Sequence, residues 1–230
     1  MFVDLSRAVS RLGCSSLRFD LSGRGDSSGN YEDTDLDMMI EDTFAAASFM
    51  REKTAVGQVV LCGICSGGNV ALGTASLSKE VDGLMLLSTP LFAPQRNELG
   101  VGRRSRGRIL RDYIVKVFRP AMWYKLCKGM VNFRAVGKVL TSDAESDSKK
   151  DSRRNIMNDL QGYAGKALFI YGTNDTESAG APDYYRSYTA ENGIPASFEE
   201  VEGSDHNFYT TAWQKALEEK ICSWITATFP

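Results

Sequence analysis

Short apolar segments that alternate with helical patterns constrain the fold of this 230-residue chain most. Each apolar segment is rich in β-branched or aliphatic residues and is followed by a turn-rich loop, as is typical of strands. Strands that alternate with helices predict an α/β fold, with a mostly parallel sheet and helices on both of its faces. The strands are predicted at 15–21, 58–62, 83–88, 167–171 and 196–201.

Apolar residues at helical spacing predict helices at 1–12, 35–52, 67–78 and about 211–227. In sheets of this kind, ligands bind at the carboxyl ends of the strands. The loops that follow the predicted strands are therefore the places to look for chemistry. They read SGRGDSSG, GICSGG, STP, GTND and GSDHNF.

Residues 91–158 have a composition of their own, with 16 Lys/Arg against 6 Asp/Glu. We expect them to form a helical cap inserted into a core made of 1–90 and 159–230. A basic cap over a site would attract an anionic substrate. Trp123, within this segment, is expected to contact the substrate. The plain alternative is a solvated helical face with no part in binding.

Composition excludes several classes of protein. A net charge of −2 argues against broad nucleic-acid binding, and five irregularly spaced cysteines do not resemble a secreted disulfide framework. The apolar runs are too short to span a bilayer, and the amphipathic N-terminus lacks a signal-peptide core, so we expect a cytoplasmic protein. One histidine and scattered acids form no convincing metal site, and GRGDSSG lacks the lysine of a phosphate-binding loop. We therefore expect no metal and no cofactor.

The segment VVLCGICSGGN at 59–69 carries the strongest chemical signal. A nucleophile elbow has small residues two before and two after the nucleophile. Around Cys65 these are Gly63 and Gly67, whereas around Ser66 one of them is the β-branched Ile64. We therefore predict Cys65 as the nucleophile, with the Ser66 amide as an oxyanion donor. The start of a helix also lowers the pKa of a thiol.

Two other interpretations of this segment remain open. Cys62 and Cys65 form a C-x-x-C pair, which in thioredoxin-like folds also opens a helix and carries redox chemistry. The glycines alone also fit a tight turn with no chemical role.

His206 is the chain's single histidine and lies after the last predicted strand, at the same sheet edge as Cys65. A general base placed there could reach a nucleophile at the elbow. Asp175, in the loop after the preceding strand, is the predicted orienting acid. Glu177 and Asp205 are the alternatives, although Asp205 is adjacent to the ring in sequence.

Four segments together resemble the α/β-hydrolases, namely LRFDLSGRGDSSG, GICSGG, LFIYGTND and GSDHNF. The order nucleophile, acid, base is also that of this superfamily. The elbow G-x-C-x-G-G is similar to that of dienelactone hydrolases, which use a Cys-His-Asp triad. The segment at 110–140, together with 17–29, resembles the exosortase A-associated hydrolases of bacterial exopolysaccharide gene clusters.

The resemblance implies roles for particular residues. Cys65 matches the nucleophile, Asp175 the acid and His206 the base, while Arg24 and Asp26 match a loop that shapes the mouth of the site. Family members begin with further strands, one of which is followed by an oxyanion loop. The expectation is therefore a truncated reading frame, or a gap that another segment or chain fills.

The predicted function is a hydrolase that forms an acyl-enzyme at Cys65 from an ester, lactone or thioester. The predicted partner is a small acyl substrate, with no nucleic acid, and a homo-oligomer is an alternative to a monomer. Two other functions remain as hypotheses, a hydrolase-like protein that binds without turnover and a thiol redox protein.

Overall fold

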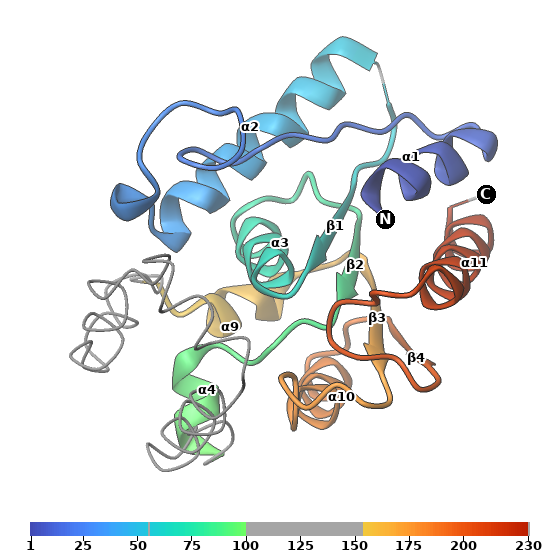
Figure 1. Cartoon of the computed structure of the whole chain (residues 1–230). Coiled ribbons are helices and arrows are strands. Elements are labelled where there is room, and N and C mark those ends of the chain that lie inside the picture. The colour runs from blue at the N-terminus through green and yellow to red at the C-terminus, as the bar shows by residue number, and fades with distance from the viewer. Residues whose placement is uncertain (55, 100–153, 230) are drawn as a thin grey trace, which may run out of the picture. The chain divides into compact units, whose positions relative to one another are not determined.

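The computed structural model describes residues 1–54, 56–99 and 154–229 (Figure 1). Its sheet has four parallel strands in the order β1-β2-β3-β4. Parallel pairing confirms the predicted α/β class. The strands are β1 (Val60–Ile64), β2 (Gly83–Leu87), β3 (Lys166–Gly172) and β4 (Ala196–Val201).

One face of the sheet is covered by α1 (Phe2–Arg11) and α11 (Thr211–Thr228). Both helices bury one stripe of apolar residues against alternate residues of β2 and β3, as the period of a strand requires. An ion pair of 2.9 Å between Arg11 and Glu218 also joins these two helices. The buried cluster on this face includes Leu5, Val9, Met85, Leu87, Leu168, Ile170, Leu217 and Ile221.

The other face is covered by α2 (Leu36–Thr54), α3 (Ser66–Leu77), α9 (Ile156–Asp159) and α10 (Ala181–Glu191). The strands send their remaining residues to this side, so both faces of β2 and β3 are buried. That arrangement confirms the prediction of helices on both faces. The cluster includes Ile40, Leu72, Leu84, Leu86, Phe169, Tyr171 and Tyr185.

The chain divides into two compact units, Met1–Ala93 with Lys150–Pro230, and Pro94–Lys149. The described residues of the second unit are 94–99, which include all of α4 (Ala93–Glu98) except its first residue. Most of the predicted cap at 91–158, including Trp123, lies outside the described residues. The division into core and cap therefore stays a prediction. The described residues also include two single-turn 3₁₀ helices, η1 (Tyr31–Asp33) and η2 (Leu160–Gly162).

The strand predicted at 15–21 is wrong, because the structure has no strand at these residues. The alternating pattern does not produce a sheet pairing here, and Leu17 and Phe19 are 39% and 44% exposed. A strand needs a neighbour to satisfy its backbone groups. Among the described residues, β1 pairs with β2 alone, so 15–21 finds no ladder to join.

Helix α10 is an element that the sequence analysis missed. Its first turn contains Pro182, a favoured residue at that position, and Gly180 precedes it in a left-handed conformation. Tyr185 and Tyr188 are buried at three-residue spacing. These signals were present in the sequence.

Among the helices that the structure describes, none combines the length and the hydropathy that a membrane span requires.

Candidate active site

Cys65 occupies a sharp turn between β1, which ends at Ile64, and α3, which begins at Ser66. Its backbone angles are φ 53° and ψ −125°, and such a conformation costs a non-glycine residue about 1–3 kcal/mol. The Cys65 amide donates a hydrogen bond of 2.8 Å to the carbonyl of Leu87. Thus β2 holds the strained turn in place, and strain at a thiol of this kind indicates a functional position.

The glycines around the turn have unequal roles. A Cβ on Gly63 would lie 2.2 Å from the carbonyl oxygen of Gly67, and a Cβ on Gly68 would lie 1.9 Å from Oγ1 of Thr89. A Cβ on Gly67 would meet nothing within 4 Å outside its own helix. Close packing therefore requires Gly63 and Gly68. The elbow pattern predicts that a residue larger than glycine would clash at position 67, and the structure does not bear this out.

His206 and Asp175 form a buried hydrogen-bonded pair. Nδ1 of His206 lies 2.9 Å from Oδ1 and 3.0 Å from Oδ2 of Asp175. The His206 side chain is 7% exposed and that of Asp175 is 1% exposed. An ionised carboxylate can only accept, so Nδ1 carries the proton and donates it. The other ring nitrogen, Nε2, is then the one that can serve a nucleophile.

Backbone groups fix the Asp175 carboxylate. Its Oδ1 accepts hydrogen bonds from the amides of Glu177, at 3.0 Å, and Ser178, at 3.1 Å. Burial by itself raises the pKa of Asp175. The hydrogen bonds from His206 and Ser178 outweigh it and leave that pKa below its usual value. Asp205, one of the two alternative acids, accepts instead from the amide of Asn207.

Cys65 and His206 are electrostatically coupled. His206 is the main cause that lowers the pKa of the Cys65 thiol, against a smaller opposing effect of burial. The hydrogen bond to Asp175, and then the interaction with Cys65, raise the pKa of His206 to about 10. Both shifts favour a thiolate beside an imidazolium. Nε2 is buried and has no aligned hydrogen bond to any described residue, so the two groups are close without forming a fully directed bond.

Ser66 places its amide beside the nucleophile. The Ser66 N–H is a further contact that lowers the pKa of Cys65. Ser66 is the first residue of α3, where backbone amides have no partner within the helix. Its side chain is exposed, whereas the Cys65 residue is half-buried.

Cys62 lies in a different environment from Cys65. It packs against the apolar cluster beneath α1 and α11, and burial raises its pKa to about 12. Both cysteines are free thiols. A redox pair needs an accessible thiolate at one end and a partner that can attack it, and Cys62 is poorly suited to either role.

Arg24 and Asp26, which are predicted to bind substrate, make their contacts with η1, with α2 and within their own loop, and their role toward a substrate stays a prediction. Arg24 stacks over the ring of Tyr31, at 4.6 Å, and its guanidinium reaches the sulfur of Met39 on α2. Asp26 is exposed, and its amide donates to Asp20 within the same loop. No group of three or more potential metal ligands occurs in the described ranges.

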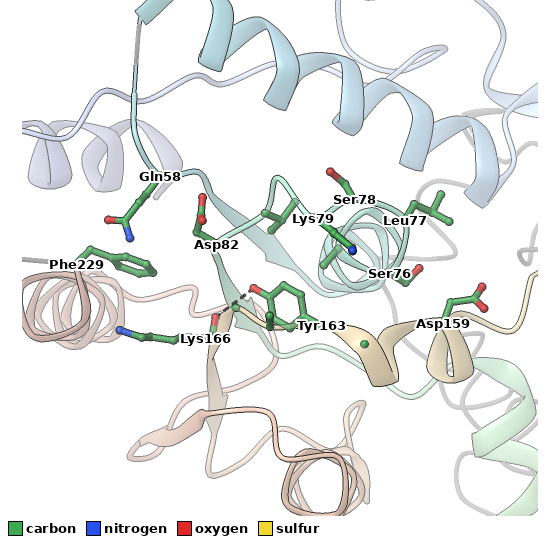
Figure 2. Close-up of a pocket in the computed structure, with 15 residues that line it drawn as sticks. Gln58, Ser76, Leu77, Ser78, Lys79, Asp82, Asp159, Tyr163, Lys166 and Phe229 are labelled. Atoms are coloured by element: carbon green, nitrogen blue, oxygen red, sulfur yellow. Dashed lines mark hydrogen bonds between the residues drawn. The ribbon is translucent and has the colours of Figure 1, made fainter.

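A separate cavity of about 580 Å³ lies at the opposite end of the strands (Figure 2). Its lining includes Asp82 just before β2 and Lys166 at the start of β3. The hydroxyl of Tyr163 closes one side by donating to the carbonyl of Lys166, at 3.4 Å. Cys65, by contrast, follows the carboxyl end of β1. This cavity therefore does not serve the chemistry of the elbow.

Sequence reasoning missed two serines that contact the site. Ser178 is 2% exposed and lies 3.3 Å from Nδ1 of His206 through its hydroxyl. Ser88 is fully buried, directly follows β2, and has a positive φ of 44°. The only signal in the sequence was their place in loops after strands, which many polar residues share.

A parallel sheet covered on both faces, with a strained turn after β1, an aspartate in the loop after β3 and a histidine in the loop after β4, defines the α/β-hydrolase fold. Comparison with solved structures shows the same fold. No protein-family model matches the chain, and no curated protein matches its sequence significantly.

Three solved structures illustrate the similarity. Est1E from Butyrivibrio proteoclasticus, solved with ferulic acid, is 14% identical with a TM-score of 0.68, and the match covers 98% of this chain and 82% of Est1E. A monoacylglycerol lipase from Paleococcus ferrophilus is 14% identical with a TM-score of 0.62, and the match covers 99% of this chain and 89% of the lipase. An α/β serine hydrolase homologue from Coxiella burnetii is 15% identical with a TM-score of 0.59, and the match covers 96% of this chain and 74% of the homologue.

The chain is shorter than these proteins. It spans about half the length, 53%, of an uncharacterised protein from Bacillus cereus ATCC 10987 that shares the fold, with 15% identity and a TM-score of 0.55. At such identities the comparison establishes the fold.

Proposed function

We propose that this protein is a thiol hydrolase that cleaves a carboxylic ester, lactone or thioester through an acyl-enzyme at Cys65. His206 acts as the acid-base group, Asp175 orients it, and the Ser66 amide stabilises the oxyanion. The observation that carries the proposal is the buried hydrogen bond of 2.9 Å between Asp175 and His206, coupled to a thiol on a strained turn.

Acylation begins with attack of the Cys65 thiolate on the carbonyl carbon of the substrate. A C–S bond forms and the π electrons move to the carbonyl oxygen, which the Ser66 N–H stabilises. When the tetrahedral intermediate collapses, the bond to the leaving oxygen or sulfur breaks. Nε2 of the imidazolium gives its proton to that leaving group, so a neutral alcohol or thiol departs.

Deacylation uses the same groups in reverse. The now neutral Nε2 accepts a proton from water, and the resulting hydroxide attacks the thioester carbonyl. Collapse of the second intermediate releases a carboxylic acid and restores the thiolate beside the imidazolium. Throughout, the hydrogen bond to Asp175 holds Nδ1–H and keeps Nε2 directed to the reaction.

The substrate class follows from composition. We propose a small anionic acyl substrate, because the 91–158 segment carries a strong excess of basic residues. Its resemblance to exosortase A-associated hydrolases leads us to place the protein in a bacterial exopolysaccharide or protein-sorting system, in the cytoplasm. Because Est1E was solved with ferulic acid, we propose an ester of ferulic acid as a first substrate to assay.

Hydrolysis of an activated aryl ester by three proteins tests the proposal. Wild type and Ser66→Ala should hydrolyse it, because the variant keeps the Ser66 amide, and Cys65→Ala should not. The reverse pattern would assign the nucleophile to Ser66. No hydrolysis by wild type, with Cys65 unreactive toward iodoacetamide at neutral pH, would favour a binding protein without turnover. A reversible Cys62–Cys65 disulfide under mild oxidation would favour the redox function.

A further inference from the structure

We propose that Ser178 is a positioning residue that locks the Asp175–His206 pair, through its amide on the carboxylate and its hydroxyl on the imidazole. This inference rests on the proposed function for its catalytic meaning, but its structural content can be tested separately. Nothing in the sequence pattern marks Ser178, which lies three residues after Asp175.

Three contacts place Ser178 at the centre of the site. Its amide donates to Oδ1 of Asp175 at 3.1 Å. Its hydroxyl donates to the carbonyl of Ser88 at 3.0 Å, and the same oxygen lies 3.3 Å from Nδ1 of His206. Ser178 is 2% exposed, so water does not compete for these contacts.

The direction of each hydrogen bond is fixed by the number of protons. A serine hydroxyl has one proton, and the carbonyl of Ser88 can only accept, so that proton goes to Ser88. Toward His206 the oxygen can then offer only a lone pair. Nδ1–H therefore faces two acceptors, the carboxylate of Asp175 and the hydroxyl of Ser178. Both acceptors favour the tautomer in which Nε2 faces the thiol.

The backbone of Ser88, whose carbonyl accepts the Ser178 hydroxyl, is held in a fixed position. Its φ of 44° is unusual for a residue with a side chain, and its amide donates to Ile170 at 2.8 Å. Ser88 directly follows β2, whose last residue, Leu87, accepts from the amide of Cys65. Ser178 thus links the acid loop to the strand end that also holds the nucleophile. Loss of its hydroxyl should loosen the ring of His206 rather than remove a reacting group.

Ser178→Ala tests the inference by NMR, because a single histidine gives one ring signal to follow. The titratable groups that act on His206 are Asp175 and Cys65. Those that act on Cys65 are His206 and Glu177. Removing an acceptor from Nδ1–H should lower the pKa of His206 by about half a unit or more. In the ester assay we expect kcat to fall about threefold to tenfold with KM nearly unchanged.

Ser78→Ala is the matched control. Ser78 is 8% exposed, follows the far end of α3, and accepts a hydrogen bond of 3.0 Å from the amide of Glu80. It should reproduce the general cost of losing a buried hydroxyl and leave the His206 titration and kcat unchanged. If Ser178→Ala does not fold, Ser178→Cys offers a group of similar size that is a weak acceptor, and the titration should shift the same way.

The possible outcomes separate this inference from the proposed function. A Ser178 variant that is folded and titrates as wild type overturns the inference, even if the enzyme hydrolyses esters. A lowered His206 pKa in the variant supports the inference. Absence of ester hydrolysis in wild type contradicts the proposed function, while the NMR titration still decides the role of Ser178.

Discussion

Oδ1 of Asp175 lies 2.9 Å from Nδ1 of His206, and the same oxygen accepts two backbone amides. Asp175→Asn should retain the shape but place an amide against Nδ1 and remove the charge that favours imidazolium. We expect ester hydrolysis to fall by about 10²-fold or more, as loss of an orienting carboxylate does in related triads. Steady-state kinetics measure this effect.

Asp205→Asn and Glu177→Gln are the controls for that prediction. The carboxylate of Asp205 accepts from the amide of Asn207 rather than from His206, and Glu177 contributes its amide, which the substitution keeps. Both variants should keep most of the activity. A large loss in Asp205→Asn with none in Asp175→Asn would move the role of the acid to Asp205.

The pH dependence of stability should reveal the coupled thiol and imidazole. His206 has a folded pKa of about 10 against an ordinary 6.5, so its contribution is fully present below pH 6.5 and is lost as pH rises toward 10. The lowered pKa of Cys65 acts in the opposite sense, with a contribution present above pH 9 and lost as pH falls. A thiolate with an imidazolium holds as many protons as a thiol with an imidazole. Between about pH 6.5 and 9 the two effects should therefore cancel.

Cys65→Ala should uncover the histidine effect, because Asp175 still raises the pKa of His206 in this variant. Its free energy of unfolding in urea should fall as pH rises above 6.5, with a slope of up to about 1.4 kcal/mol per pH unit. Wild type should be nearly flat over the same range. Equal slopes in the two proteins would mean that the thiol and the imidazole are not coupled.

The two glycines that flank Cys65 should respond differently to alanine. Gly63→Ala places a Cβ 2.2 Å from backbone oxygen and should destabilise the fold by about 1–3 kcal/mol or more. Gly67→Ala meets open space within α3 and should be neutral or stabilising by about 0.5–1 kcal/mol. Thermal unfolding of both variants measures the difference. Similar destabilisation by the two substitutions would contradict the geometry of the turn.

Ionic strength tests the proposed preference for an anionic acyl group. Paired thioesters that differ only in a terminal carboxylate or the corresponding primary amide should be compared at low and high salt. We expect kcat/KM for the carboxylate to fall severalfold between 0.01 and about 0.5 M salt, because the Debye length shrinks from about 30 Å to below 10 Å. The neutral thioester should change little. Equal salt dependence would leave the basic segment as a solvated surface.

The sequence was sufficient for the class of fold and for most elements, because periodicity reflects which face of a strand or helix is buried. The strand predicted at 15–21 is wrong, although the sequence alternates there. Strand pairing needs a neighbouring strand, and the local pattern does not show whether one is present. The sequence also could not separate Gly63 from Gly67, because the clash depends on where the backbone of the next turn lies. The role of Ser178 depends on contacts with residues 28 and 90 positions away along the chain.

Mass spectrometry of the acyl-enzyme tests whether Cys65 is the nucleophile. Wild type should be mixed with an activated ester, quenched in acid within the first turnovers and digested. We expect one acyl group on the peptide that contains Cys65, attached to sulfur and released by hydroxylamine, and none in Cys65→Ala. An acyl group on Ser66, or steady hydrolysis by Cys65→Ala at the wild-type rate, would contradict this expectation.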